Sequence, residues 1–139
     1  MRYLGLDLGS KTLGMALSDK TGLIASSLKI VRHNEEYDKL VGEVVSVVDE
    51  YQVDGIVLGL PKNMNNTIGF KGELSISFKE KLESVLDIPI YLEDERLTTK
   101  EAENILLSND TSRKKRKKVI DSMAASIILQ SYLDKRKGN

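Results

Sequence analysis

The sequence predicts an α/β fold in which a mixed five-stranded sheet carries helices on both faces. Three short apolar segments follow one another at the start of the chain, joined by turns short enough for an antiparallel meander. Two later apolar segments each follow a helical pattern, as the strands of parallel βαβ units do. The 139 residues suit one compact domain, so we expect residues 1–139 to form a single domain.

The first three strands are expected close together in the sequence. Residues 3–8 (YLGLDL) and 13–18 (LGMALS) are short apolar runs, and the GSKT between them has the length and chemistry of a hairpin turn. A third strand is expected within residues 24–32. Together these segments predict the antiparallel part of the sheet.

Helical and strand patterns then alternate. Apolar residues recur every three or four positions over 35–51, which predicts an amphipathic helix. The run DGIVLGLP (54–61) predicts a buried strand, KNMNNTIG (62–69) a polar loop, and IPIYLE (88–93) the fifth strand. The last helix is expected from about 119 to 135. The predicted apolar faces are Leu74, Phe78, Leu82 and Val85 in the second helix, Ala102, Ile105 and Leu106 in the third, and Ile120, Met123, Ala124, Ile127 and Ile128 in the last.

The composition excludes several classes of protein. The 21 Lys and Arg balance the 21 Asp and Glu, so net charge indicates no partner. The chain has no Cys, which excludes disulfides and thiolate metal sites. Its one histidine, His33, argues against a catalytic triad or a histidine zinc site, and we expect it at the surface or in a linker. No secretory signal and no apolar stretch of about 20 residues is present, which favours a cytoplasmic protein.

Asp7 stands out because it lies in an apolar strand with Gly5, Gly9 and Gly14 around it. A carboxylate that loses its hydration on burial needs a cation beside it. A metal ion is one such cation, and flanking glycines let a metal or a phosphate approach the backbone closely. The alternative is that Asp7 ends its strand and caps the turn through Gly9 and Ser10.

Further carboxylates are expected at the same edge of the sheet. Residues 93–95 (Glu-Asp-Glu) end the fifth predicted strand, and ligands gather at the carboxyl ends of parallel strands. Asp121 begins the last predicted helix, where the helix dipole alone favours an acid, and the alanines at 124–125 would let this helix approach the sheet. Three carboxylates from separate elements suit Mg²⁺ or Mn²⁺, which cleave phosphodiester bonds by activating water.

The run RKKRKK at 113–118 is a second functional signal. Such a run is often no more than a solvated loop. Its place just before Asp121 favours binding of a nucleic acid, because phosphate contacts supply much of the non-specific affinity and arginine holds phosphate in bidentate fashion. Arg96 is expected either to pair with a neighbouring acid or to contact phosphate. The expected nucleic-acid contacts are Lys11, Arg96, Arg113, Lys114, Lys115, Arg116, Lys117 and Lys118.

Four segments, in order along nearly the whole chain, resemble the YqgF/RuvX family of RNase H-like nucleases. They are GLDLGSKTLGMALSD (5–19), VLGLP (57–61), DERLTT (94–99) and VIDSMAASIILQSYL (119–133). Members of this family are named as Holliday junction resolvases and as pre-16S rRNA nucleases. The resemblance implies an RNase H-like fold, in agreement with the order of elements above, and a carboxylate cluster that binds divalent metal.

The resemblance also implies which residues carry the chemistry. Asp7, Glu95 and Asp121 are the implied catalytic residues and metal ligands, and Asp94 is the less favoured member of its pair. The fourth predicted strand lacks the acid that related junction resolvases carry there, so the role passes to Glu95 of the fifth. The loop after GLP has Asn66 where the family usually has Gly, and asparagine accepts the same left-handed backbone.

We therefore expect a Mg²⁺- or Mn²⁺-dependent endonuclease that processes the 5′ end of precursor 16S rRNA in ribosome biogenesis. A Holliday junction resolvase and a non-catalytic nucleic-acid-binding assembly factor are the alternatives, with either a monomer or a homodimer. The segment LDLGSKTLG also resembles the first phosphate-binding hairpin of sugar kinases and actin-like ATPases. Those enzymes enclose ATP between two lobes, and this chain supplies one.

Overall fold

The computed structural model describes residues 1–63, 65–95 and 113–137, with the backbone alone at 113–122 and 137. Its centre is a five-stranded sheet with the strand order β3-β2-β1-β4-β5. β1, β2 and β3 pair antiparallel, whereas β4 pairs parallel with both β1 and β5. The predicted mixed sheet is therefore confirmed. The strands are β1 (Tyr3–Leu8), β2 (Thr12–Ser18), β3 (Ala25–Arg32), β4 (Gly55–Leu60) and β5 (Ile90–Asp94).

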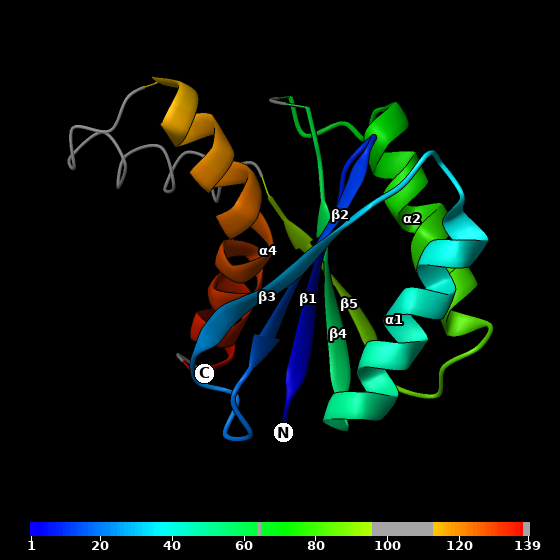
Figure 1. Cartoon of the computed structure of the whole chain (residues 1–139), viewed down its shortest axis with the longest axis vertical. Coiled ribbons are helices and arrows are strands. Elements are labelled where there is room, and N and C mark those ends of the chain that lie inside the picture. The colour runs from blue at the N-terminus through cyan, green and yellow to red at the C-terminus, as the bar shows by residue number, and fades with distance from the viewer. Residues whose placement is uncertain (64, 96–112, 138–139) are drawn as a thin grey trace.

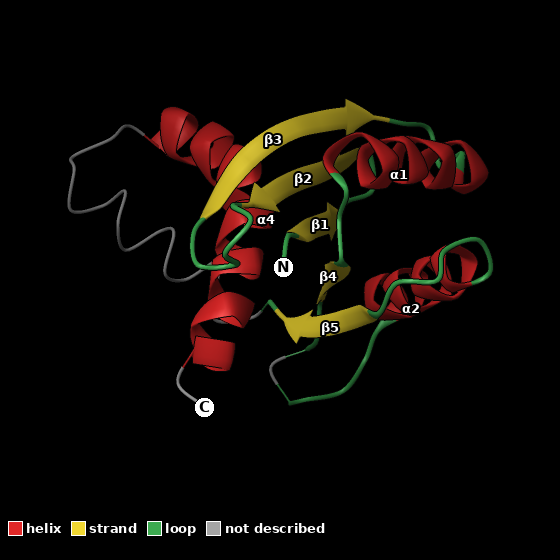
Figure 2. Cartoon of the chain, turned by 90° about the horizontal axis from the view of Figure 1, so that it is seen from below, coloured by secondary structure: helices red, strands yellow, loops and turns green. Residues whose placement is uncertain are grey.

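Helices cover both faces of the sheet, as predicted. α1 (Tyr37–Tyr51) and α2 (Phe70–Glu83) lie on one face, and α4 (Arg113–Lys137) crosses the other (Figures 1 and 2). The third predicted helix, with Ala102, Ile105 and Leu106, lies outside the described residues. None of the helices in the described ranges is long and apolar enough to cross a bilayer.

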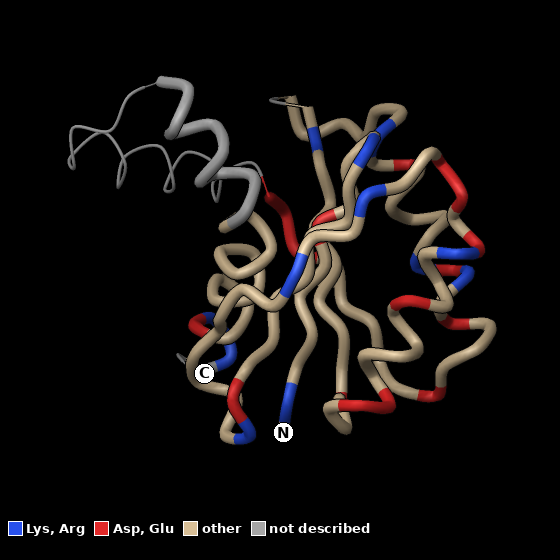
Figure 3. The backbone as a smooth tube through the Cα atoms, viewed as in Figure 1, with Lys and Arg blue, Asp and Glu red and all other residues tan. Residues whose placement is uncertain are grey.

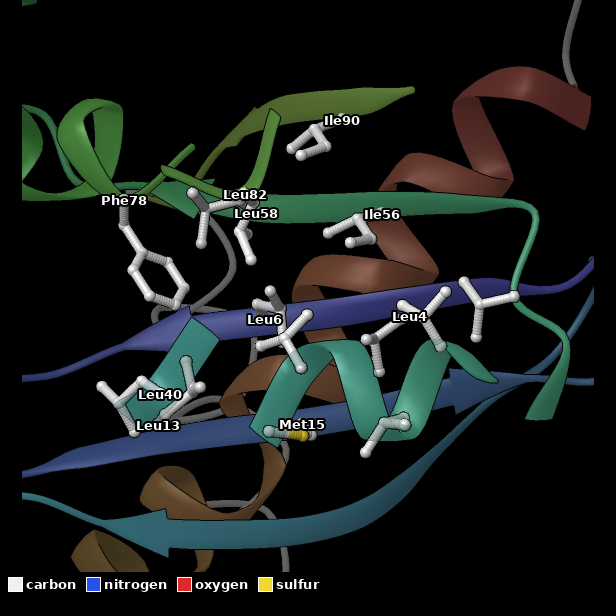
Figure 4. Packing of buried hydrophobic residues seen from close by; sticks show 14 residues of the cluster. Leu4, Leu6, Leu13, Met15, Leu40, Ile56, Leu58, Phe78, Leu82 and Ile90 are labelled. Carbon is white, nitrogen blue, oxygen red and sulfur yellow. The ribbon is translucent and has the colours of Figure 1, made fainter. Parts of the chain in front are cut away.

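The larger core lies between the sheet and the pair α1 and α2 (Figure 4). Alternate residues of β1 and β4, such as Leu6 and Leu58, point to this face and are fully buried against Phe78 of α2. Each such side chain stabilises the fold by about 1.5–3 kcal/mol. Phe78 and Leu82 confirm the predicted face of the second helix, but Val85 lies beyond its end and is 57% exposed, so its assignment to that face is wrong.

The smaller core lies under α4, which packs closely on the sheet. A Cβ at Gly5 would lie only 2.7 Å from the Cβ of Leu129 and 2.9 Å from the carbonyl oxygen of Ala125. The predicted close approach through a small residue is therefore confirmed at Ala125. The predicted face of this helix is rotated, because the residues buried there are Ala125, Ile128, Leu129 and Leu133, whereas Ala124 and Ile127 are half-buried.

Candidate active site

The candidate site lies at one edge of the sheet. β1, β4 and β5 run in the same direction, so their carboxyl ends meet there (Figure 1). Asp7 is the next-to-last residue of β1, and Glu95 follows β5 directly. Figure 3 shows acidic segments close together at this edge, where open α/β sheets hold their ligands.

Asp7 faces α4, because alternate residues of a strand point to the same side. Tyr3, on that side of β1, belongs to the core under α4. Gly14 pairs with Asp7 from β2, and a Cβ at Gly14 would lie 3.8 Å from the Cβ of Asp7 and 3.6 Å from that of Ala125. The side chain of Asp7 therefore begins close to α4.

Glu95 reaches Asp7 across β4. Its backbone N–H donates to the carbonyl oxygen of Leu60, 3.3 Å away, which holds it beside the end of β4. Its carboxyl group lies over Gly59, where a Cβ would be 3.5 Å from Cδ of Glu95 and closer still to Oε2. Burial and the charge of Asp7 raise the pKa of Glu95 to about 8, and the neutral carboxyl group donates a hydrogen bond to Asp7. The two groups therefore hold a proton between them at neutral pH.

The other two acids at the end of β5 have different surroundings. Glu93 is only 4% exposed, and its carboxylate pairs with the ammonium group of Lys135 near the end of α4. The negative charge of Asp94 also raises the pKa of Glu95, but its effect is smaller than those of burial, Asp7 and Lys71. Glu95 is thus the acid of this strand end that bonds to Asp7.

The pair Asp7 and Glu95 fits a divalent cation. It supplies carboxylate oxygens, the ligands that Mg²⁺ and Mn²⁺ prefer, and burial beside Asp7 disfavours a negative charge on Glu95 that a cation would offset. Within the described residues, no group of three or more Asp, Glu, His or Cys side chains is arranged to bind a metal. A third carboxylate ligand would therefore have to come from a residue whose side chain is not described.

Asp121, the third predicted ligand, lies on α4 where the structure describes the backbone alone. From its C-terminal end toward its N-terminus, α4 contacts the sheet first through Leu129 at Gly5 and then through Ala125 at Gly14. Gly14 is the residue of β2 that pairs with Asp7. The next turn of the helix carries position 121, four residues before Ala125. The backbone of α4 therefore runs toward the carboxyl end of β1, which is compatible with the predicted role of Asp121.

The basic run is part of a helix and not of a loop. α4 already includes Arg113, whereas we expected the last helix to begin near Val119. Lysine and arginine are good helix formers, but a run without apolar residues shows no helical period. The side chains of 113–118 and the whole of Arg96 lie outside the described residues. Lys11 is exposed in the turn between β1 and β2, beside the carboxyl end of β1.

Lys71, at the start of α2, belongs to the site and was missed in the sequence. Its charge lowers the pKa of Glu95, against the effect of burial and of Asp7. Phe70, just before it, is 75% exposed. A lysine in the first turn of a helix opposes the helix dipole. That unfavourable position is the sequence signal that would have singled out Lys71.

His33 lies in the linker between β3 and α1, one of its two expected places, but it is buried there rather than at the surface. It is 8% exposed, and its Nε2 lies 2.9 Å from the carbonyl oxygen of Gly9, in the turn that follows Asp7. Its Nδ1 accepts a hydrogen bond of 2.9 Å from the backbone N–H of Glu35. The Nδ1 acceptor requires the proton to be on Nε2, so the neutral ring ties the Asp7 turn to the start of α1.

The loop after β4 forms a compact turn at the same edge of the sheet. Asn66 has a φ of 70°, which confirms the left-handed conformation expected for it. The backbone N–H of Asn63 donates to the carbonyl oxygen of Thr67 at 2.8 Å, and the hydroxyl of Thr67 donates to Oδ1 of Asn65 at 2.6 Å. Asn66 therefore makes the left-handed turn that the resemblance to the family implied.

Comparison with known proteins identifies close relatives. The model of the RuvX family, described as Holliday junction resolvase, matches residues 1–135. A relative from Staphylococcus epidermidis is 56% identical over 135 residues, covering 96% of this chain and 95% of the relative. A relative from Bacillus subtilis is 53% identical over 135 residues, covering 96% and 98%. Both relatives have the name "Putative pre-16S rRNA nuclease".

Solved structures share the fold at low sequence identity. RuvC of Thermus thermophilus matches with a TM-score of 0.60 and 15% identity, over 99% of this chain and 97% of that chain. The fowlpox virus Holliday junction resolvase matches with a TM-score of 0.59 and 14% identity, over 97% and 99%. These likenesses confirm the RNase H-like fold. By its family match and its relatives, the chain belongs to the RuvX family of nucleases.

Proposed function

We propose that this chain is a divalent-metal-dependent endonuclease that hydrolyses phosphodiester bonds at the 5′ end of precursor 16S rRNA. The observation that carries the proposal is the hydrogen-bonded pair Asp7 and Glu95 at the carboxyl edge of the sheet. Nuclease chemistry is that of the family, and relatives more than half identical to the chain are named for precursor 16S rRNA. Those names favour this RNA over other structured nucleic acids.

Asp7, Glu95 and Asp121 are the residues that would hold Mg²⁺ or Mn²⁺ through carboxylate oxygens. When bound, such an ion lowers the pKa of water and offsets the negative charge that develops on the phosphate. Glu95 must lose its proton before it can bind a cation. That loss leaves both Glu95 and Asp7 charged, which is the state that a cation stabilises.

Positive side chains around the carboxyl pair hold the substrate. Lys71 acts on the site from α2, and Lys11 lies in the turn after Asp7. The basic run 113–118 lies on α4, before the position of Asp121. Contacts to phosphate position a nucleic acid without reading its bases, which suits a substrate recognised by its structure.

A Holliday junction resolvase is the second candidate, because the matching family is described by that activity. Structures of Thermus thermophilus RuvC and of the fowlpox virus resolvase with junction DNA share the fold. Symmetric cleavage of a four-way junction requires two active sites and thus a homodimer, whereas a monomer suffices to trim RNA. We further infer that residues 1–139 form one nuclease domain that acts in the bacterial cytoplasm, where precursor rRNA is made.

A cleavage assay tests this proposal. Purified protein is incubated with Mg²⁺ or Mn²⁺ and either a precursor 16S rRNA fragment or a synthetic four-way DNA junction. Asp7→Asn removes one ligand, and Asp49→Asn, on the exposed end of α1, makes the same change far from the site. We expect cleavage of the RNA by the wild type and by Asp49→Asn, and none by a folded Asp7→Asn.

Each other result has a definite meaning. Symmetric nicking of the junction alone, lost in Asp7→Asn, identifies a resolvase. Full activity in Asp7→Asn refutes the assignment of the site. Binding of RNA without cleavage by the wild type in either metal identifies a non-catalytic assembly factor.

A further inference from the structure

We propose that Gly59 is a positioning residue, because the missing side chain opens the path by which Glu95 crosses β4 to reach Asp7. This inference rests on the proposed function only for the role that it gives to the two carboxyl groups. The crossing itself is a matter of geometry on one face of the sheet.

The sheet topology makes the crossing necessary. β4 lies between β1, which carries Asp7, and β5, which leads into Glu95. Leu58 pairs with Leu6 of β1, and Gly59 pairs with Glu93 of β5. Gly59 therefore lies on the strand between Asp7 and Glu95, at the level of these two acids. Val57, two residues before Gly59, belongs to the core under α4, so both positions face α4. A side chain at 59 would stand between Asp7 and Glu95.

The carboxyl group of Glu95 occupies the space where that side chain would stand. A Cβ at Gly59 would collide with Oε2 of Glu95 and lie 3.5 Å from its Cδ. It would also lie 2.7 Å from Cδ1 of Ile128 on α4. Both obstructing atoms are tips of side chains that can turn away. An alanine here should therefore leave the fold intact and displace Glu95.

Two other glycines that face α4 have different neighbours. At Gly5 a Cβ would meet the carbonyl oxygen of Ala125 at 2.9 Å, so that glycine serves the packing of the helix backbone. At Gly14 the nearest atoms lie at 3.6 Å or more, the range of ordinary contact. Gly59 differs from both because a carboxyl group takes up its space.

The competing explanation is that Gly59 only makes room for Ile128. Ile128→Ala removes that contact, so the double variant Gly59→Ala/Ile128→Ala retains only the collision with Glu95. The matched reference is Ile128→Ala alone, and Gly42→Ala, where a Cβ would meet nothing within 4 Å, controls for adding a methyl group away from the site. Thermal unfolding confirms that each variant is folded, and calorimetry with Mn²⁺ then measures metal affinity.

We expect the double variant to bind Mn²⁺ about 10–100-fold more weakly than Ile128→Ala, the usual effect of losing a group that orients a metal ligand. Its crystal structure should show the carboxyl group of Glu95 moved away from Asp7. A double variant in which Glu95 still reaches Asp7 would overturn the proposal, as would unchanged Mn²⁺ affinity. If the wild type neither binds Mn²⁺ nor cleaves nucleic acid, the proposed function fails, and the position of Glu95 in the crystal structures still decides the role of Gly59.

Discussion

The carboxyl group of Glu95 donates a hydrogen bond to Asp7, although β4 separates β1 from the strand that leads into Glu95. The pKa of Glu95 rises from its ordinary 4.5 to about 8. The metal-free folded protein therefore binds a proton between these pH values that the unfolded chain does not bind. The contribution of Glu95 to the free energy of unfolding therefore falls as the pH rises from about 4.5 to about 8.

Glu95→Gln should remove this pH dependence, because glutamine carries no ionisable proton and keeps the hydrogen-bond donor. At pH 9 in EDTA we expect the variant to melt at least about 4 °C above the wild type, the shift that about 1 kcal/mol produces in a domain of this size. At pH 4 the difference should vanish or reverse. Thermal scans across this pH range, with Asp49→Asn as the charge control, measure the effect, and parallel curves for Glu95→Gln and wild type would contradict it.

Lys71→Gln should weaken substrate binding, because the charge of Lys71 acts on Glu95 from α2 and, under the proposed function, would attract phosphate. We expect the slope of log affinity against log salt to fall by about 0.7–0.9, the loss of one phosphate contact. Lys79→Gln is the matched control, since Lys79 lies on the same helix and pairs with Glu83 at 3.0 Å. Filter binding at several salt concentrations gives the slopes, and equal slopes for the two variants would exclude Lys71 from the interface.

Replacing Lys114, Lys115, Lys117 and Lys118 by glutamine should reduce the salt dependence of binding much further, by about 3 in the slope if all four contact phosphate. Glutamine has nearly the helix propensity of lysine, so the start of α4 should be preserved. The control is the same exchange at four lysines outside the basic run, Lys20, Lys29, Lys39 and Lys79. A slope equal to that of the wild type would show that the basic run makes no phosphate contacts.

His33→Ala should destabilise the fold by about 1–3 kcal/mol, because it leaves the carbonyl oxygen of Gly9 and the N–H of Glu35 without the imidazole. Mn²⁺ affinity should fall as well, since Gly9 lies in the turn after Asp7. Urea unfolding and calorimetry measure the two effects. A loss of stability with unchanged Mn²⁺ affinity would show that His33 supports the fold without positioning the turn.

Local patterns predicted the sheet and two of the helices well, because burial of one face imposes a period on the sequence. The start of α4 was missed since Arg113–Lys118 has no apolar period, although its residues favour helix. The burial of His33 depends on the carbonyl oxygen of Gly9, which is distant in the sequence. No local pattern reports such a contact.

The sequence predicted only part of the site, because local patterns do not report contacts between residues distant in the sequence. A strand end with three acids located the carboxyl edge, but the hydrogen bond of Glu95 to Asp7 depends on an empty position on β4. Lys71 joins the site only through the way α2 docks beside β4, so its role follows from tertiary structure. The place of Asp121 in the site stays a prediction.

Because α4 is continuous, it sets a fixed distance between the basic run at 113–118 and the carboxyl edge of the sheet. One unbroken helix runs from Arg113 through position 121 to the contact of Ala125 with the sheet. At a rise of about 1.5 Å per residue, position 121 lies about 12 Å along the axis from Arg113. A sugar–phosphate backbone bound by residues 113–118 would thus lie at a fixed distance from Asp7. The distance along α4, rather than the base sequence, would then determine which phosphodiester bond of the substrate is cut.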